Sequence, residues 1–168
     1  MSPPSAAAQL QPAPGPQPSF ILPDARGERF ALDAQRGHVV IVHFFATWCE
    51  PCREELPALN RLAERSNGTI WVLAISVDEP DDRVERFFRA TPVRFPVLLD
   101  RDRAVAKSWN VTTLPSSFVL DADLKPRLAV ETDFAWDTVD PRTLAGELTA
   151  TTQTQGTSQL QEDKHAIR

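Results

Sequence analysis

The chain has 168 residues, of which 42% are hydrophobic and 24% are charged, which is ordinary usage for a globular protein. Its formal net charge of −5 provides no basic surface for nucleic acid, and it contains no run of about 18 apolar residues that would span a membrane. Two cysteines are too few for a disulfide-dense scaffold, so the folded domain must be stabilised by its hydrophobic core.

The two ends differ in composition from the middle. Residues 1–19 are rich in proline, alanine and glutamine, and the first charged side chain is Asp24. This stretch lacks the basic and apolar regions of an intact secretory signal, and it predicts a disordered, proline-rich linker. Residues 149–168 are rich in threonine, glutamine and serine. They have too little apolar surface to offset the entropy of ordering and predict a flexible polar tail. The predicted folded domain is therefore 20–148.

The middle of the chain alternates between strand and helix patterns. Residues 20–22 and 29–32 flank a polar turn at Gly27 and predict an N-terminal hairpin. Continuous apolar, β-branched runs predict buried strands, and apolar residues that recur every three or four positions predict helices. We expect the strands at 39–45, 69–77, 96–99, 117–120 and 128–131, and the helices at 51–65, 81–90, 102–109 and 140–148. This order implies an α/β fold with a central sheet flanked by helices.

Cys49 and Cys52 lie between the strand predicted at 39–45 and the helix that follows it. On a first helical turn, side chains at this spacing are about 5–6 Å apart at Cβ, close to disulfide distance. The free N–H groups of a helix N-terminus favour a negative charge. Cys49 is therefore predicted to be the reactive thiolate and Cys52 the resolving thiol. Pro51 suits the first turn, where its missing N–H costs no hydrogen bond.

Other uses of this cysteine pair fit the sequence less well. A structural zinc site needs four ligands, and the chain has three histidines and no second cysteine pair. Haem attachment needs a histidine directly after the second cysteine, where this chain has Arg53. A permanent disulfide across so short a loop would stabilise the fold little. We therefore expect no metal and no organic cofactor, only a redox-active disulfide between Cys49 and Cys52.

Residues 42–57, which read VHFFATWCEPCREELP, resemble the active-site stretch of the TlpA/ResA-like thiol–disulfide oxidoreductases, a branch of the thioredoxin superfamily. Residues 114–120, LPSSFVL, are similar to the segment of that family that carries a cis-proline. The resemblance covers about residues 20–148. It implies a thioredoxin-like fold, with a central mixed sheet flanked by helices, an N-terminal hairpin and a central helix insert at 81–90.

The resemblance also implies how substrate is bound. It implies a cis peptide bond before Pro115, beside Cys49, although most X–Pro bonds are trans. The backbone of Leu114 would then pair with an extended substrate chain, and Trp48 would shield the cysteines and offer an apolar contact. From the residues alone, Pro115 also fits the start of an ordinary trans strand.

Two titratable residues are candidates for proton transfer and for tuning the thiols. The resemblance implies that Glu79, which follows the strand predicted at 69–77, points toward the cysteines; in its acidic turn it fits a solvated charge equally well. His43 interrupts an apolar strand where similar proteins often hold a buried acid. It is either a hydrogen-bonded core residue or a proton acceptor that modulates Cys52. Glu55 matches the family pattern and is expected to be a helix-surface charge.

The expected function is thiol–disulfide exchange, with the protein acting as a protein-disulfide reductase through Cys49 attack and Cys52 resolution. The resemblance implies a bacterial periplasmic protein, membrane-anchored through a segment before residue 1 and re-reduced by a membrane thiol-transfer protein. Its clients would be protein cysteine pairs, such as those of apocytochrome c or of copper-site assembly proteins. Ser116 stands where members that act in cytochrome c maturation often have an acid, which favours a more general reductase.

The alternative is a Cu(I)-binding assembly or carrier protein that uses the same cysteines, because soft thiolates suit Cu(I). Related copper-assembly proteins have a wider cysteine spacing and a downstream histidine, whereas the only late histidine here is His165, in the predicted tail. The direction of electron flow depends on the reduction potential of the cysteine pair, which the spacing leaves open.

Overall fold

The computed structural model describes residues 9–149; the start of the predicted linker, the predicted tail from 150 onward and His165 lie outside this range. The strands are β1 Gln11–Pro12, β2 Ile21–Pro23, β3 Arg29–Ala31, β4 Val39–Phe45, β5 Ile70–Val77, β6 Val97–Asp100, β7 Ser116–Leu120 and β8 Pro126–Val130. The helices are α1 Glu50–Ser66, α2 Asp81–Ala90 and α3 Ala104–Ser108, with short 3-10 helices η1 Leu32–Gln35 and η2 Trp136–Thr138. Residues 141–149 are also helical.

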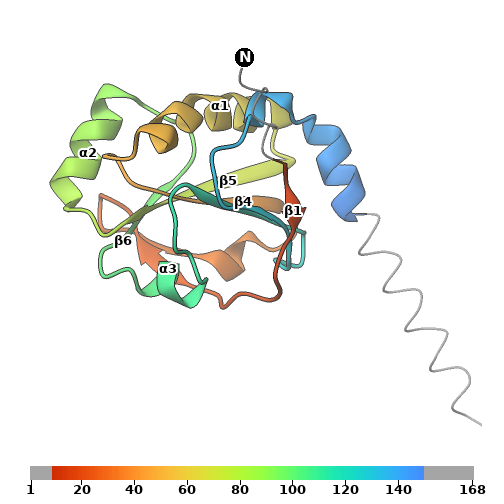
Figure 1. Ribbon diagram of the computed structural model, residues 1–168, viewed down its shortest axis with the longest axis horizontal. Helices are drawn as coiled ribbons and strands as arrows, with labels where there is room; N and C mark the ends of the chain where they lie inside the picture. Colours follow the sequence, from red (N-terminus) through yellow and green to blue (C-terminus); the bar gives the residue numbers. More distant parts are fainter. Residues whose placement is uncertain (1–8, 150–168) are drawn as a thin grey trace, which may run out of the picture.

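The main sheet has six strands in the order β1-β8-β7-β4-β5-β6, and β2 and β3 form a separate hairpin. β4, β5 and β6 are parallel to one another, whereas β7 is antiparallel to both β4 and β8. α1 and α2 cover one face of the sheet, and α3 lies on the other (Figure 1). The predicted mixed sheet with flanking helices is present, and the predicted strands and helices end within one or two residues of the observed ones.

β4 is the central strand and is buried along its whole length. Alternate side chains of a strand face opposite sides of the sheet. Val39, Ile41 and Phe45 pack in the core under α1, and the intervening apolar residues of β4 pack in the core on the α3 side, with the hairpin. By the same alternation, His43 lies on the α1 face.

α1 begins directly beyond the turn that follows β4. Cys49 is its N-cap in an extended conformation, and a proline occupies the first turn, as expected. Asn67 ends the helix with φ of 50°, a left-handed conformation that asparagine tolerates. One face of the helix is buried and includes Cys52, Glu55, Leu56, Leu59 and Leu62. α1 therefore carries both cysteines over the carboxyl end of β4.

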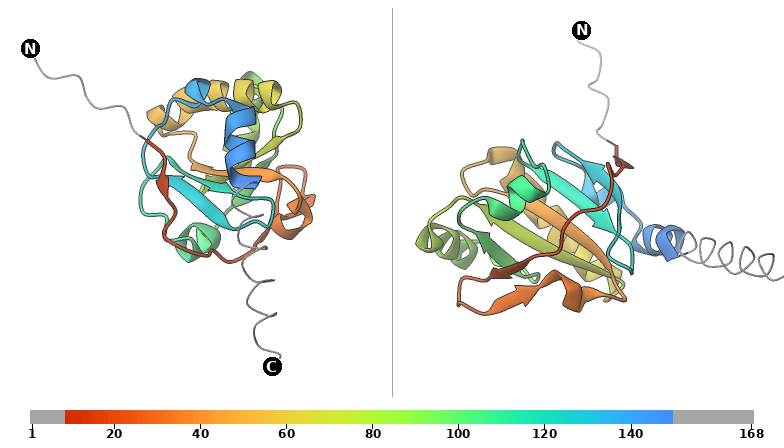
Figure 2. Two further views of the ribbon diagram at one scale, coloured as in Figure 1. Left: turned by 90° about the vertical axis from the view of Figure 1, so that its right-hand side faces the viewer. Right: turned by 90° about the horizontal axis from the view of Figure 1, so that it is seen from below.

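The expected disordered linker needs correction within residues 9–19. β1 lies in this stretch and pairs with β8 in antiparallel register, at the edge of the sheet (Figure 2). The indole N–H of Trp109 donates to the carbonyl oxygen of Pro18 at 2.9 Å. Without β1, β8 would present unpaired backbone groups, and pairing them requires no particular side chains. The ordered domain thus begins before residue 20. No helix in residues 9–149 is both long and apolar enough to cross a bilayer.

Candidate active site

Cys49 and Cys52 form a disulfide at the N-terminus of α1, with their Cα atoms 5.2 Å apart. The backbone N–H of Cys52 donates to Cys49 Sγ at 3.4 Å. Cys49 is 7% exposed, whereas Cys52 is 0% exposed. The small exposed area of this disulfide therefore belongs to Cys49, so Cys49 is the cysteine that a reacting molecule meets first.

The helix end also gives the two sulfurs different electrostatic surroundings. When the disulfide is reduced, Cys49 Sγ remains at the N-cap of α1, where free N–H groups and the helix dipole favour an anion. The thiolate is the form that attacks a disulfide. The greater exposure of Cys49 and its position at the N-terminus of α1 thus both agree with the expectation that Cys49 is the nucleophile.

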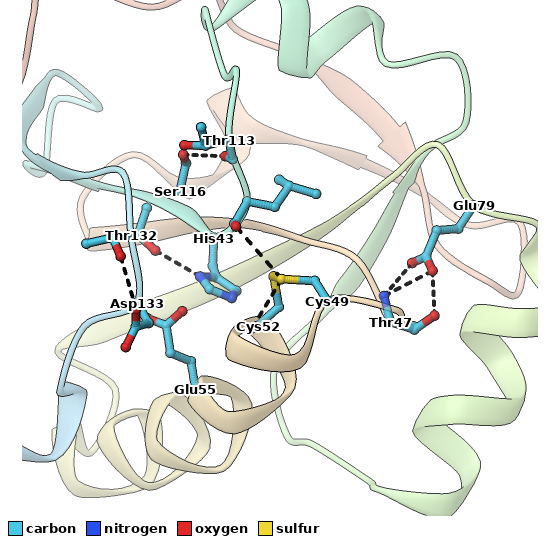
Figure 3. Close-up of a disulfide and its surroundings, with 12 residues drawn as sticks. His43, Thr47, Cys49, Cys52, Glu55, Glu79, Thr113, Ser116, Thr132 and Asp133 are labelled. Carbon is cyan, nitrogen blue, oxygen red and sulfur yellow. Dashed lines mark hydrogen bonds between the residues drawn. A yellow bond between two sulfur atoms is a disulfide. The ribbon is translucent and has the colours of Figure 1, made fainter.

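The segment before β7 lies against Cys49. The Leu114–Pro115 peptide bond is cis, as the resemblance implied, and the carbonyl oxygen of Leu114 lies 3.8 Å from Cys49 Sγ (Figure 3). Ser116 Oγ donates to the carbonyl oxygen of Thr113 at 2.7 Å, which holds this turn. Trp48, next to the cysteine, is 64% exposed. An exposed indole and an ordered backbone segment therefore flank the reachable sulfur.

Glu79 is buried, which excludes the solvated charge that its acidic turn suggested. Its carboxylate accepts hydrogen bonds from the backbone N–H and the hydroxyl of Thr47 and from Ser76 Oγ. In Figure 3 it lies beyond Thr47, on the side away from the disulfide. Glu79 therefore hydrogen-bonds to the turn that precedes Trp48 and Cys49. It holds this turn in place and does not point toward a sulfur.

His43 is 0% exposed and lies on the sheet face that α1 covers. Its Nδ1 is 2.8 Å from Ser117 Oγ, and its Nε2 has no hydrogen-bond partner in the described part of the chain. Burial lowers the pKa of His43 to about 3, so the ring is neutral at neutral pH. This agrees with a hydrogen-bonded core residue and leaves Nε2 free to accept or donate a hydrogen bond, according to the tautomer.

Glu55 is buried rather than a surface charge, contrary to expectation, with 4% of its surface exposed. Its Oε1 accepts hydrogen bonds from the Phe134 N–H at 2.9 Å and from the Trp136 indole N–H at 2.8 Å. Its Oε2 has no hydrogen-bond partner within residues 9–149. Burial raises the pKa of Glu55 to about 7 and Asp133 adds to the rise, while the two hydrogen bonds oppose it.

The sequence did contain a signal for Glu55. Cys52, Glu55, Leu59 and Leu62 recur at spacings of three and four, which is the buried stripe of α1. Glu55 is three residues from Cys52, so the two side chains share one helix face. A carboxyl group that titrates near neutral pH therefore lies on the same face of α1 as the buried sulfur. Among residues 9–149, no three His, Cys, Asp or Glu side chains are placed to hold a metal ion.

Comparison with known proteins agrees with this geometry. Residues 15–127 match the AhpC/TSA family. The chain belongs to this family. The match includes the cysteine pair, the cis-proline segment and every strand of the main sheet except β1 and most of β8.

Relatives of this AhpC/TSA-family chain include thiol-disulfide oxidoreductases named ResA. It is 35% identical over 109 residues to ResA of Bacillus subtilis and 37% identical over 106 residues to ResA of Geobacillus kaustophilus. The alignments cover 64% and 62% of this chain and 61% and 60% of the two relatives. The chain thus spans less than two thirds of their length. These relatives confirm the resemblance to ResA-like proteins.

Solved structures place this family member in the thioredoxin-like fold. A thiol:disulfide interchange protein of the thioredoxin family from Chlorobium tepidum superposes with a TM-score of 0.66 at 24% identity, over 84% of this chain and 99% of that one. A secreted disulfide oxidoreductase from Mycobacterium tuberculosis gives 0.63 at 22% identity, over 78% and 95%. The predicted fold class is confirmed.

Proposed function

We propose that this chain is a thiol–disulfide oxidoreductase that reduces disulfides in proteins. The observation that carries the proposal is a disulfide with one reachable sulfur, Cys49, at a helix N-terminus, and one sealed sulfur, Cys52, behind it. A disulfide across so short a loop contributes little to stability, so a structural role does not account for it. Similarity to ResA and to a thiol:disulfide interchange protein supports the proposal.

In the first step, the thiolate of reduced Cys49 attacks one sulfur of a client disulfide. A Cys49–client disulfide forms, the client's own S–S bond breaks, and its second sulfur leaves as a thiolate that takes a proton from water. The exposed indole of Trp48 and the backbone of Leu114 lie beside the reacting sulfur and would hold the client there.

In the second step, the thiol of Cys52 loses its proton and its sulfur attacks Cys49 Sγ. The Cys49–Cys52 disulfide forms, and the client leaves with both sulfurs reduced, so two electrons pass from this chain to the client. Glu55, on the same face of α1 and with a pKa of about 7, is our candidate to accept the Cys52 proton. His43, the other buried residue expected to handle protons, is a weaker candidate, because burial lowers its pKa to about 3 and makes Nε2 a poor proton acceptor.

We further propose a periplasmic location, a membrane anchor before residue 1 and a membrane thiol-transfer protein as electron donor. The Mycobacterium tuberculosis neighbour is named as secreted, and disulfides persist mainly outside the cytoplasm. Client cysteine pairs of apocytochrome c or of copper-site assembly proteins fit this setting. Ser116 is buried and uncharged at the position after the cis-proline, which supports a reductase of broader client range.

A single-turnover assay tests both the activity and its direction. The chain is reduced, freed of small thiols and mixed with insulin. We expect each chain to lose two thiols while insulin gains two, because the reduced pair donates both electrons. The oxidised chain serves as the control and should leave insulin unchanged. A reduced chain that keeps its thiols in the presence of insulin would contradict the proposal.

The alternative function is a Cu(I) carrier, and the same preparation of reduced protein distinguishes it from a reductase. The reduced chain is loaded with Cu(I) and passed through a desalting column with a competing chelator. A reductase is expected to lose the metal and still reduce insulin. Stoichiometric retention of Cu(I), together with no exchange with insulin, would replace the reductase by the carrier.

A further inference from the structure

A pocket of about 250 Å³ opens beside the disulfide, between the end of β5, α3 and the segment before β7. Trp48 and Leu114 form the wall nearest the cysteines. Buried apolar side chains form its floor: Val77, Ala106 and Val111. Leu114 also lies 3.8 Å from Cys49 Sγ and Trp48 precedes Cys49 in the chain, so the pocket adjoins the site where a client disulfide would react.

The rim of the pocket is charged. Asp78 and Arg103 line it from the turns that follow β5 and β6, and both are exposed. Both residues adopt left-handed backbone angles, with φ of 55° and 63°. Neither forms an ion pair with another of the residues that the structure describes. An apolar floor inside a polar rim is the usual anatomy of a surface that binds another protein.

The size of the pocket indicates what it can hold. Sites for cofactors and drug-sized molecules typically measure about 300–1,000 Å³. This pocket is smaller and open on one side, so it suits a single side chain of a bound polypeptide.

Strand geometry indicates which client side chain reaches the pocket. In an extended chain, side chains two residues apart point to the same side and lie about 6–7 Å from each other, while their immediate neighbours point away. A client segment that runs along Leu114 with its cysteine directed at Cys49 therefore directs the side chain two residues away toward this protein. Trp48 and Leu114 form the boundary that this side chain would cross to enter the pocket.

Resting on the function proposed above, we propose that this pocket binds one apolar client side chain, about the size of leucine, two residues from the cysteine that Cys49 attacks. The pocket then selects extended protein segments with an apolar residue at that position. A charged residue there would lose its water without gaining a partner on the floor. Burial of a leucine side chain in a half-open pocket is expected to raise kcat/KM about tenfold over glycine.

Symmetrical disulfide dimers of a short peptide test the proposal, because both of their sulfurs are equivalent. The peptides carry leucine, glycine or aspartate at one or two residues before or after the cysteine. With the reduced chain, we expect leucine to exceed glycine about tenfold in kcat/KM at one of the two positions that lie two residues away. Aspartate should be slower than glycine there. The immediately adjacent positions should show no leucine preference.

A variant that fills the pocket tests whether the leucine preference arises from this pocket. Thr112 is exposed and lines the pocket mouth, so Thr112→Phe adds bulk there without entering the core. The leucine and glycine peptides should then react at equal rates. Lys107→Phe is the matched control: Lys107 is exposed on α3 and does not line the pocket, so this variant should keep the wild-type preference.

The outcomes separate this proposal from the proposed function. Reduction of every peptide at the same rate, or a leucine preference that survives Thr112→Phe, would overturn the pocket proposal and leave the oxidoreductase standing. No reduction of any peptide or of insulin would overturn the proposed function itself.

Discussion

Cys49→Ser is expected to abolish reduction of insulin, lowering the rate by roughly a thousandfold or more, as removal of a covalent nucleophile usually does. Serine keeps the N-cap position but has no sulfur to form the mixed disulfide. Because Cys52 is fully buried, it cannot take over the attack. Initial rates with insulin under single-turnover conditions measure the effect.

Cys52→Ser is the matched variant and should behave differently. Cys49 can still attack, but nothing resolves the product, so a covalent Cys49–client species should accumulate. Mass spectrometry under non-reducing conditions detects it. If Cys49→Ser trapped the client and Cys52→Ser did not, the roles assigned to the two cysteines would be reversed.

His43 is expected to cause a large loss of stability in acid. Its pKa is about 3 in the folded chain, below the ordinary 6.5. Between these values the unfolded chain binds a proton that the folded chain does not, so the free energy of unfolding falls as the pH falls. The loss approaches ~5 kcal/mol over the window, at about 1.4 kcal/mol per pH unit. In His43→Asn, whose amide can keep a hydrogen bond to Ser117, this loss should be absent.

Glu55 gives the free energy of unfolding a pH dependence of the opposite sign, so a Glu55 variant serves as the control for His43. Its pKa is raised from 4.5 to about 7, so the folded chain binds the extra proton and stability falls as the pH rises through that window. In the wild type the two slopes should nearly cancel between about pH 4.5 and 6.5. Urea unfolding of the oxidised protein should then show stability rising with pH in Glu55→Gln and falling with pH in His43→Asn. Parallel curves for all three proteins would contradict both assignments.

The fold was largely predictable because its elements are local patterns. The continuous apolar run of β4 predicts a strand that is buried on both faces. The cysteines and Pro51 that follow it predict the start of α1. The cis bond at Pro115 followed from the family resemblance and not from the residues, because a proline at the start of a strand is usually trans.

What escaped prediction depends on partners far away in the chain. Glu55 lies on the buried stripe of α1, but its hydrogen-bond partners, Phe134 and Trp136, are visible only in the fold. Glu79 accepts hydrogen bonds from nearby Ser76 and from Thr47, which is 32 residues away. β1 forms through backbone pairing with β8, which leaves almost no mark on composition. Periodicity marks the helix face on which Glu55 lies, but it identifies none of these distant partners.

Alkylation of the reduced protein at pH 7 tests the central claim most directly. At this pH a free cysteine, with a pKa of about 8.5, is only a few per cent thiolate. Mass spectrometry can follow the labelling of each cysteine by iodoacetamide, with free cysteine as the reference. If the N-terminus of α1 stabilises the anion, Cys49 should react about tenfold faster than the reference, and Cys52 more slowly than it. A Cys49 that reacts no faster than free cysteine would contradict the account.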